Sequence, residues 1–167
     1  GLKYVLGRMV ELPEKAVDSA TKKQWQRMLD ELPPLPAAKE DDRTYLLPAL
    51  EFSDRSNSEN PPLYAVFPYR LFGLGKPDLE VGRLTFEKRR VKGTGGWRQD
   101  SIQAAYLGLT DTARAYVTQN FSRWHGDARF PAFWGPNADW IPDQDHGSVA
   151  LTALQRMLLQ VEGDKIL

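Results

Sequence analysis

Apolar residues recur at helical spacing along most of this chain, and no stretch shows the sustained apolar–polar alternation of a half-buried strand. The most regular stretch runs from 149 to 161 and places on one face Ala150, Leu154, Met157, Leu158 and Val161. Other helices are predicted over residues 2–11, 21–32, 77–91, 99–109 and 110–124. The pattern predicts an all-α protein of helical hairpins, and only the apolar run at 44–52 fits helix or strand equally well.

The composition is that of one soluble globular domain of 167 residues. Its 22 basic and 22 acidic residues balance to zero net charge, so the basic surplus of a typical nucleic-acid binder is absent. No apolar run of about 18 residues is present, which excludes a helix through a membrane. The chain contains no cysteine, which excludes disulfides and thiolate metal sites.

Both ends of the chain look cut. It opens on GLKYVLG, with neither Met nor a signal peptide, and closes on GDKIL, where a strand is expected to begin. We therefore expect a piece of a longer protein, whose own first residues carry no information about export.

The stretch ARFPAFWGPNADWIPDQDHGS (128–148) combines aromatic rings with carboxylates and amides. Its three prolines and two glycines argue against a regular helix through it. Aromatic rings stack on the C–H faces of a pyranose, while Asp, Asn and Gln bind its hydroxyls. The stretch therefore indicates a sugar-binding cleft. The alternative is a cap whose aromatic residues seal one end of a helical core.

Three long connections, at 51–62, 92–98 and 125–147, recur at about every second helix junction. In a ring of helical hairpins alternate junctions lie on the same side, so we expect these connections to converge on one face. Two carboxylates facing each other across an aromatic-lined pocket are the basic apparatus of glycoside hydrolysis. The candidate residues are Glu51, Asn57, Glu59, Asn60, Trp97, Gln99, Asp100, Trp134, Asn137, Asp139, Trp140, Asp143, Asp145 and His146.

Glu51 lies between Leu50 and Phe52, and a general acid needs apolar neighbours to keep its proton at neutral pH. Glu59 has polar neighbours instead. Structural interpretations compete with these roles. Turn or cap roles before a helix at 63 would account for Asn57, Glu59 and Asn60. A carboxylate near the positive end of a helix dipole would account for Asp100, Asp143 and Asp145.

Asp143, Asp145 and His146 combine carboxylate and imidazole, and both are metal ligands. No second cluster of His or Cys accompanies them, so neither a metal nor a cofactor is expected. The basic run at 88–92 is interpreted as a solvated helix end rather than a phosphate site.

Three segments read NSENPPLYAVFPYRLFG, GWRQDSIQAAYLGL and RFPAFWGPNADWIPDQDHGSVALTALQRMLLQ. They resemble the C-terminal half of the catalytic region in bacterial proteins similar to glycoside hydrolase family 95, which includes α-L-fucosidases and related α-galactosidases. The resemblance covers about residues 44–167, with 1–43 as a helical lead-in. It implies one domain over 1–167 that forms about half of an (α/α)6 toroid.

The resemblance also implies an inverting mechanism and an extracytoplasmic location. Glu51, followed by an aromatic residue, would be the general acid, with Glu59 as the alternative, and Asp143 would activate water through asparagine side chains. A sugar platform would come from Trp97, Trp134 and Trp140. The implied partner is the missing N-terminal half of the ring, so the chain alone would be inactive. The stretch SNSENPPLYAVFP lacks the histidines usual in the family, which leaves the sugar open.

Two other functions account for the same residues. One is a carbohydrate-binding module that uses the aromatic residues without catalysis. The other is a helical scaffold, in which the aromatic loop docks a protein partner or the missing half of the ring, and whose exposed apolar surface would cause self-association.

Overall fold

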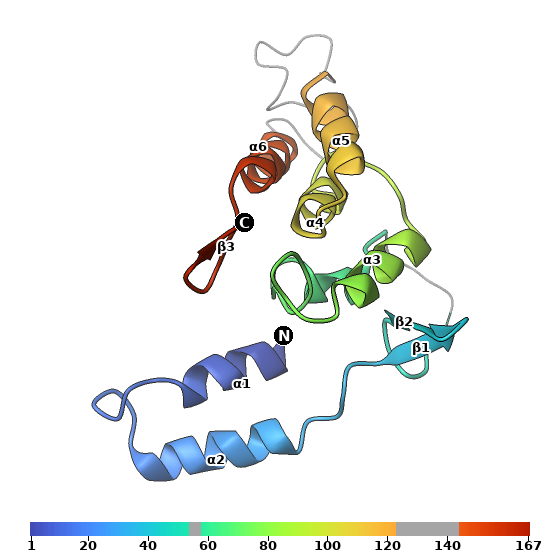
Figure 1. Cartoon of the computed structure of the whole chain (residues 1–167). Helices are drawn as coiled ribbons and strands as arrows, with labels where there is room; N and C mark the ends of the chain where they lie inside the picture. The colour runs from blue at the N-terminus through green and yellow to red at the C-terminus, as the bar shows by residue number, and fades with distance from the viewer. Residues whose placement is uncertain (54–57, 123–143) are drawn as a thin grey trace. The chain divides into compact units, whose positions relative to one another are not determined.

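The computed structural model describes residues 1–53, 58–122 and 144–167, which form two compact units, Gly1–Pro36 and Ala37–Leu167 (Figure 1). Within these ranges the chain is mostly helical, with six α-helices and two small antiparallel sheets. The two sheets correct the prediction of a purely α-helical protein. The boundary between the two units lies at Pro36. None of the described helices is both long and apolar enough to cross a membrane.

The smaller unit is a pair of packed helices, α1 (Leu2–Val10) and α2 (Ser19–Asp30). Asp18 caps α2, since its carboxylate accepts hydrogen bonds from the backbone N–H and the hydroxyl of Thr21 at 2.9 and 2.6 Å. These hydrogen bonds hold the pKa of Asp18 below its usual range. The helix therefore begins at Ser19, and the predicted start at Thr21 is wrong. Thr21 lies in the first turn of α2, where it donates hydrogen bonds to the N-cap residue Asp18.

The larger unit opens with a hairpin of two short strands, β1 (Ala37–Glu40) and β2 (Arg43–Leu46). Asp41 and Asp42 form its turn with φ of 47° and 61°, and a two-residue type I′ turn requires positive φ at both positions. Aspartate tolerates this conformation better than most residues. The apolar run at 44–52 is thus strand as far as Leu46.

The hydroxyl of Thr85 joins β2 to α3 (Leu79–Lys88). The hydroxyl oxygen accepts a hydrogen bond from the backbone N–H of Leu46 at 2.9 Å, and the O–H group donates to the carbonyl of Val81 at 2.6 Å. The 3-10 helix η1 (Pro61–Ala65) contacts the same α-helix. This group of elements carries the first cavity described below.

The core of the larger unit surrounds α4 (Asp100–Tyr106), which is buried along its whole length. Against it and against each other pack α5 (Thr110–Ser122) and α6 (Gln144–Leu158) (Figure 1). The fully buried side chains of Leu63, Val66 and Leu107 each contribute about 1.5–3 kcal/mol by burial. The core side chains are Leu63, Val66, Phe86, Ile102, Ala104, Ala105, Tyr106, Leu107, Ala113, Val117 and Ala153.

The start of α6 corrects one expectation. No regular helix was expected through 128–148, but residues 144–148 belong to α6. Asp145 lies in the first turn, where a carboxylate favours the positive end of the helix dipole.

The chain closes on a small hairpin, β3 (Val161–Glu162) and β4 (Lys165–Ile166), at the place where a strand was expected. Arg70 donates a hydrogen bond to Glu162 at 3.2 Å, and Lys76 forms an ion pair with the same carboxylate. The hydrogen bond from Lys76, with that from Arg70, holds the pKa of Glu162 below its usual range. These contacts tie the hairpin to the segment before α3.

Candidate functional site

Glu51, Glu59 and Asn60 line one cavity of about 670 Å³. Small-molecule sites commonly occupy about 300–1,000 Å³. Two carboxylates that are eight positions apart in the sequence are thus brought to one concave surface. This arrangement is the strongest candidate for a functional site in the described part of the chain.

The wall of this cavity is partly aromatic and partly basic. Phe52 exposes 54% of its surface, so its ring is available to a ligand, and Tyr45 also lines the cavity. The floor includes Thr85, whose hydroxyl is already engaged by β2 and α3. The basic residues come from the C-terminal end of α3 and are Lys88, Arg89 and Arg90.

Glu59 is held in place by Tyr64. The phenol of Tyr64 donates a hydrogen bond of 2.5 Å to the Glu59 carboxylate, and both side chains are partly buried. Burial, with a further contribution from the bond to Glu59, raises the pKa of Tyr64 from 10.0 to about 12.

Tyr64 gives a pH-dependent prediction. Because its pKa is raised to about 12 in the folded chain, its contribution to stability is complete below the unfolded value of 10.0 and is lost as the pH rises through about 12. An ultraviolet titration should show a phenolate step near pH 12 that disappears in Tyr64→Phe and persists in the exposed control Tyr4→Phe. A wild-type titration complete by about pH 11 would contradict the hydrogen bond between Tyr64 and Glu59.

Glu51 is in a different environment. Its side chain is exposed, and none of the described residues pairs with it or donates a hydrogen bond to it. Of the two carboxyl groups, Glu51 is therefore the one that no described residue engages. The apolar shielding that the sequence predicts for it is absent here, since Leu50 exposes 77% and Phe52 54% of their surfaces.

Asn60, in the first long connection, is hydrogen-bonded to Val91, which lies just after α3. Its side-chain amide donates to the carbonyl of Val91 at 2.8 Å and accepts from the N–H of Val91 at 3.3 Å. Val91 precedes the connection at 92–98, so the convergence of the connections at 51–62 and 92–98 stays a prediction. The connection at 125–147 lies largely outside the described residues, so its place on the same face stays a prediction.

Arg89, which lines the cavity, forms a buried ion pair with Asp100. The Nε of Arg89 lies 2.7 Å from Asp100 Oδ1, and their side chains are only 5% and 4% exposed. The prediction of a solvated basic run at 88–92 is therefore wrong at Arg89, which is drawn inward by this carboxylate. Asp100 contacts Arg89 and is not among the residues that line the cavity.

The remaining candidates are distributed as follows. Trp97 and Gln99 are partly buried and do not line the cavity, and no described residue donates a hydrogen bond to the buried Oε1 of Gln99. Asp145 is exposed at the start of α6, and His146 follows it in the same helix. Outside the described residues lie Asn57, Trp134, Asn137, Asp139, Trp140 and Asp143.

Sequence reasoning did not identify Tyr64, Tyr45 or Arg89 as parts of this region. Tyr64 lies five residues after Glu59, and this short separation in the sequence could have suggested a contact between its hydroxyl and the carboxylate. Tyr45 and Arg89 reach the cavity through tertiary packing, for which the sequence contains no local signal.

Comparisons of the chain with protein-family models, with curated proteins and with solved structures return no match.

Proposed function

We propose that this chain is part of an inverting α-glycoside hydrolase of the family 95 type. In this proposal it forms about half of an (α/α)6 toroid, acts on an α-L-fucoside or α-galactoside, and requires the rest of the ring for turnover. The observation that supports it best is the shared cavity, in which Glu51 and Glu59 lie with an exposed aromatic ring.

The roles of the two carboxyl groups follow from their surroundings. Glu51 is exposed and makes no hydrogen bond or ion pair with the described residues, so its carboxyl group can contact a ligand, and we assign it as the acid that protonates the leaving oxygen. The missing part of the ring would supply the apolar cover that a general acid requires. Glu59, whose carboxylate accepts the Tyr64 hydroxyl, is better suited to binding a sugar hydroxyl. Asp143 remains the proposed water-activating residue on the family resemblance alone.

A binding experiment tests the cavity itself. Methyl α-L-fucoside and methyl α-D-galactoside are titrated calorimetrically into the chain. Saturable binding is expected, and Phe52→Ala should weaken it roughly fivefold, because the lost stacking is worth about 1 kcal/mol. Leu50→Ala is the matched control, since Leu50 is still more exposed but does not line the cavity.

The outcomes separate the proposal from its rivals. Equal affinities of the Phe52→Ala and Leu50→Ala variants would show that the sugar does not bind in this cavity. Binding without any hydrolysis by a complete ring would favour a carbohydrate-binding module. No response to sugars together with self-association of the chain would favour the scaffold.

A further inference from the structure

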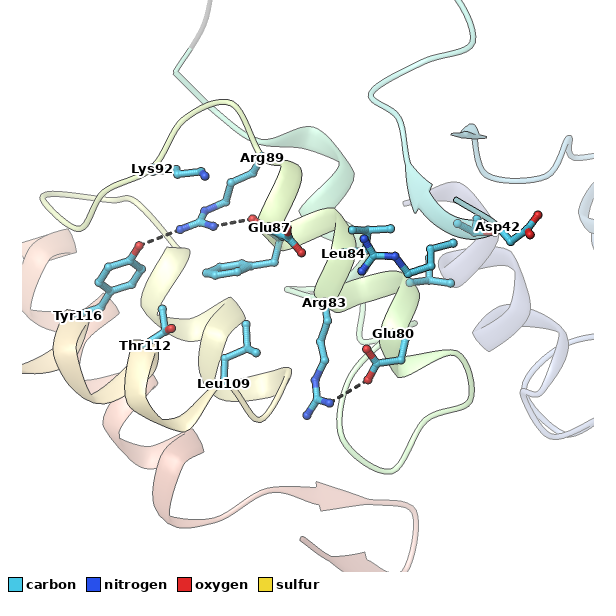
Figure 2. A pocket seen from close by; sticks show the side chains of 14 residues that line it. Asp42, Glu80, Arg83, Leu84, Glu87, Arg89, Lys92, Leu109, Thr112 and Tyr116 are labelled. Atoms are coloured by element: carbon cyan, nitrogen blue, oxygen red, sulfur yellow. Dashed lines mark hydrogen bonds and ion pairs between the residues drawn. The ribbon is translucent and has the colours of Figure 1, made fainter. Parts of the chain in front are cut away.

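Arg89 also lines a second cavity, of about 680 Å³, formed by the β1–β2 turn, α3, and α5. Figure 2 shows Arg89 and Tyr116 close together at one end of this cavity and Asp42 at the other. Between them Arg83 is paired with Glu80 at 2.8 Å. The volume again lies within the range of about 300–1,000 Å³ that small-molecule sites occupy.

The end at Arg89 offers donors and few acceptors. Arg89 uses three of its N–H groups on Asp100, the Phe86 carbonyl and the Tyr116 oxygen. A guanidinium carries about five N–H groups, so others stay available. The Tyr116 oxygen accepts from Arg89 at 2.9 Å, so its own proton is free to donate, and no described residue accepts it. Lys92 is exposed, and its ammonium has no ion pair within the described ranges.

The balance of charge limits the ligand further. The charge of Arg89 is offset by Asp100 at 2.7 Å, which leaves the ammonium of Lys92 as the unpaired positive charge at this end. The exposed carboxylate of Glu87 lines the same cavity and opposes an anion there. A group that only accepts hydrogen bonds and carries a single negative charge fits these conditions, and an ionised carboxyl group has both properties.

The cavity also has apolar lining beside its charged groups. Leu84, Phe86 and Leu109 line it, and the guanidinium of Arg89 lies 3.5 Å from the centre of the Phe86 ring. We propose that this cavity binds a small organic acid, whose carboxylate accepts hydrogen bonds from Arg89, Lys92 and Tyr116 while its apolar body contacts these side chains. The proposal is independent of the sugar site.

Titration of benzoate into the chain, followed by NMR, tests this proposal. For a ligand of this size we expect a Kd of about 1 mM. Lys92→Gln should raise the Kd at least about fivefold, since it removes the unpaired charge. Lys165→Gln, an exposed lysine on β4, is the matched control and should leave the Kd unchanged. Benzyl alcohol, which has the same ring without the charge, should not saturate.

Two further variants test the donors and the sign of the charge effect. Tyr116→Phe should raise the Kd about threefold, as one neutral hydrogen bond is lost. Glu87→Gln should lower it, because a like charge is removed. Unfolding midpoints of all variants confirm folding. Three results would overturn the assignment. They are no binding of benzoate, an equal Kd for benzoate in wild type and Lys92→Gln, or tighter binding of phenyl phosphate than of benzoate.

Discussion

Replacing Asp100 with alanine is expected to lower the free energy of unfolding of the larger unit by about 3–5 kcal/mol. The side chain of Arg89 is only 5% exposed, and the substitution leaves its guanidinium without a counter-charge. Total stability of a domain is only about 5–15 kcal/mol, so the change would bring the unit close to unfolding at room temperature. Denaturant unfolding followed by circular dichroism measures it.

The chain offers a matched control for this ion pair. Asp111 pairs with Arg114 at 3.2 Å, but their side chains are 94% and 73% exposed. Exposed pairs contribute little, so Asp111→Ala should leave the unfolding curve nearly unchanged. In the double variant Arg89→Met with Asp100→Leu no buried charge remains, and much of the lost stability should return. Similar effects of Asp100→Ala and Asp111→Ala would contradict the buried pair.

The largest effect on activity is expected at Glu51. In the complete catalytic domain that we propose, Glu51→Gln should lower kcat about 10²–10⁴-fold on an alkyl glycoside. Glutamine has nearly the same shape but cannot donate a proton to the leaving oxygen. On a dinitrophenyl glycoside, whose leaving group needs little protonation, the loss should be much smaller.

That difference between leaving groups identifies the acid. Glu59→Gln should weaken sugar binding with a similar effect on both substrates, because Glu59 is assigned to hydroxyl binding. If Glu59→Gln instead showed the strong dependence on the leaving group and Glu51→Gln did not, the two roles would be exchanged. Equal rates for wild type and both variants would exclude this cavity from catalysis.

The helices were largely predictable because their apolar residues repeat at helical spacing. A strand was expected at the C-terminal end, but the β1–β2 hairpin was not predicted, because each of its strands is four residues long and the alternation is too brief to stand out. The β1–β2 turn depends on Asp41 and Asp42 adopting positive φ, which their local sequence permits but does not require. The start of α2 was predicted two residues late, at Thr21, whereas Asp18 caps the helix and Ser19 begins it.

The candidate site was predictable in part. Glu51, Glu59 and Asn60 were identified from their residue types on one connection, and the fold places them at one cavity. The sequence could not show that Arg89 is buried, since a run of basic residues at a helix end is normally solvated. Its burial depends on Asp100, eleven positions away, and on Tyr116 from another helix.

The claim on which this account depends is that the cavity shared by Glu51 and Glu59 binds a sugar. Amide NMR of the chain during titration with methyl α-L-fucoside or methyl α-D-galactoside tests it most directly. We predict that the largest shifts fall on the cavity residues Phe52, Glu59 and Thr85, while Leu151, an exposed residue of α6, does not respond. Shifts confined to other parts of the chain, or none with either sugar, would contradict the claim.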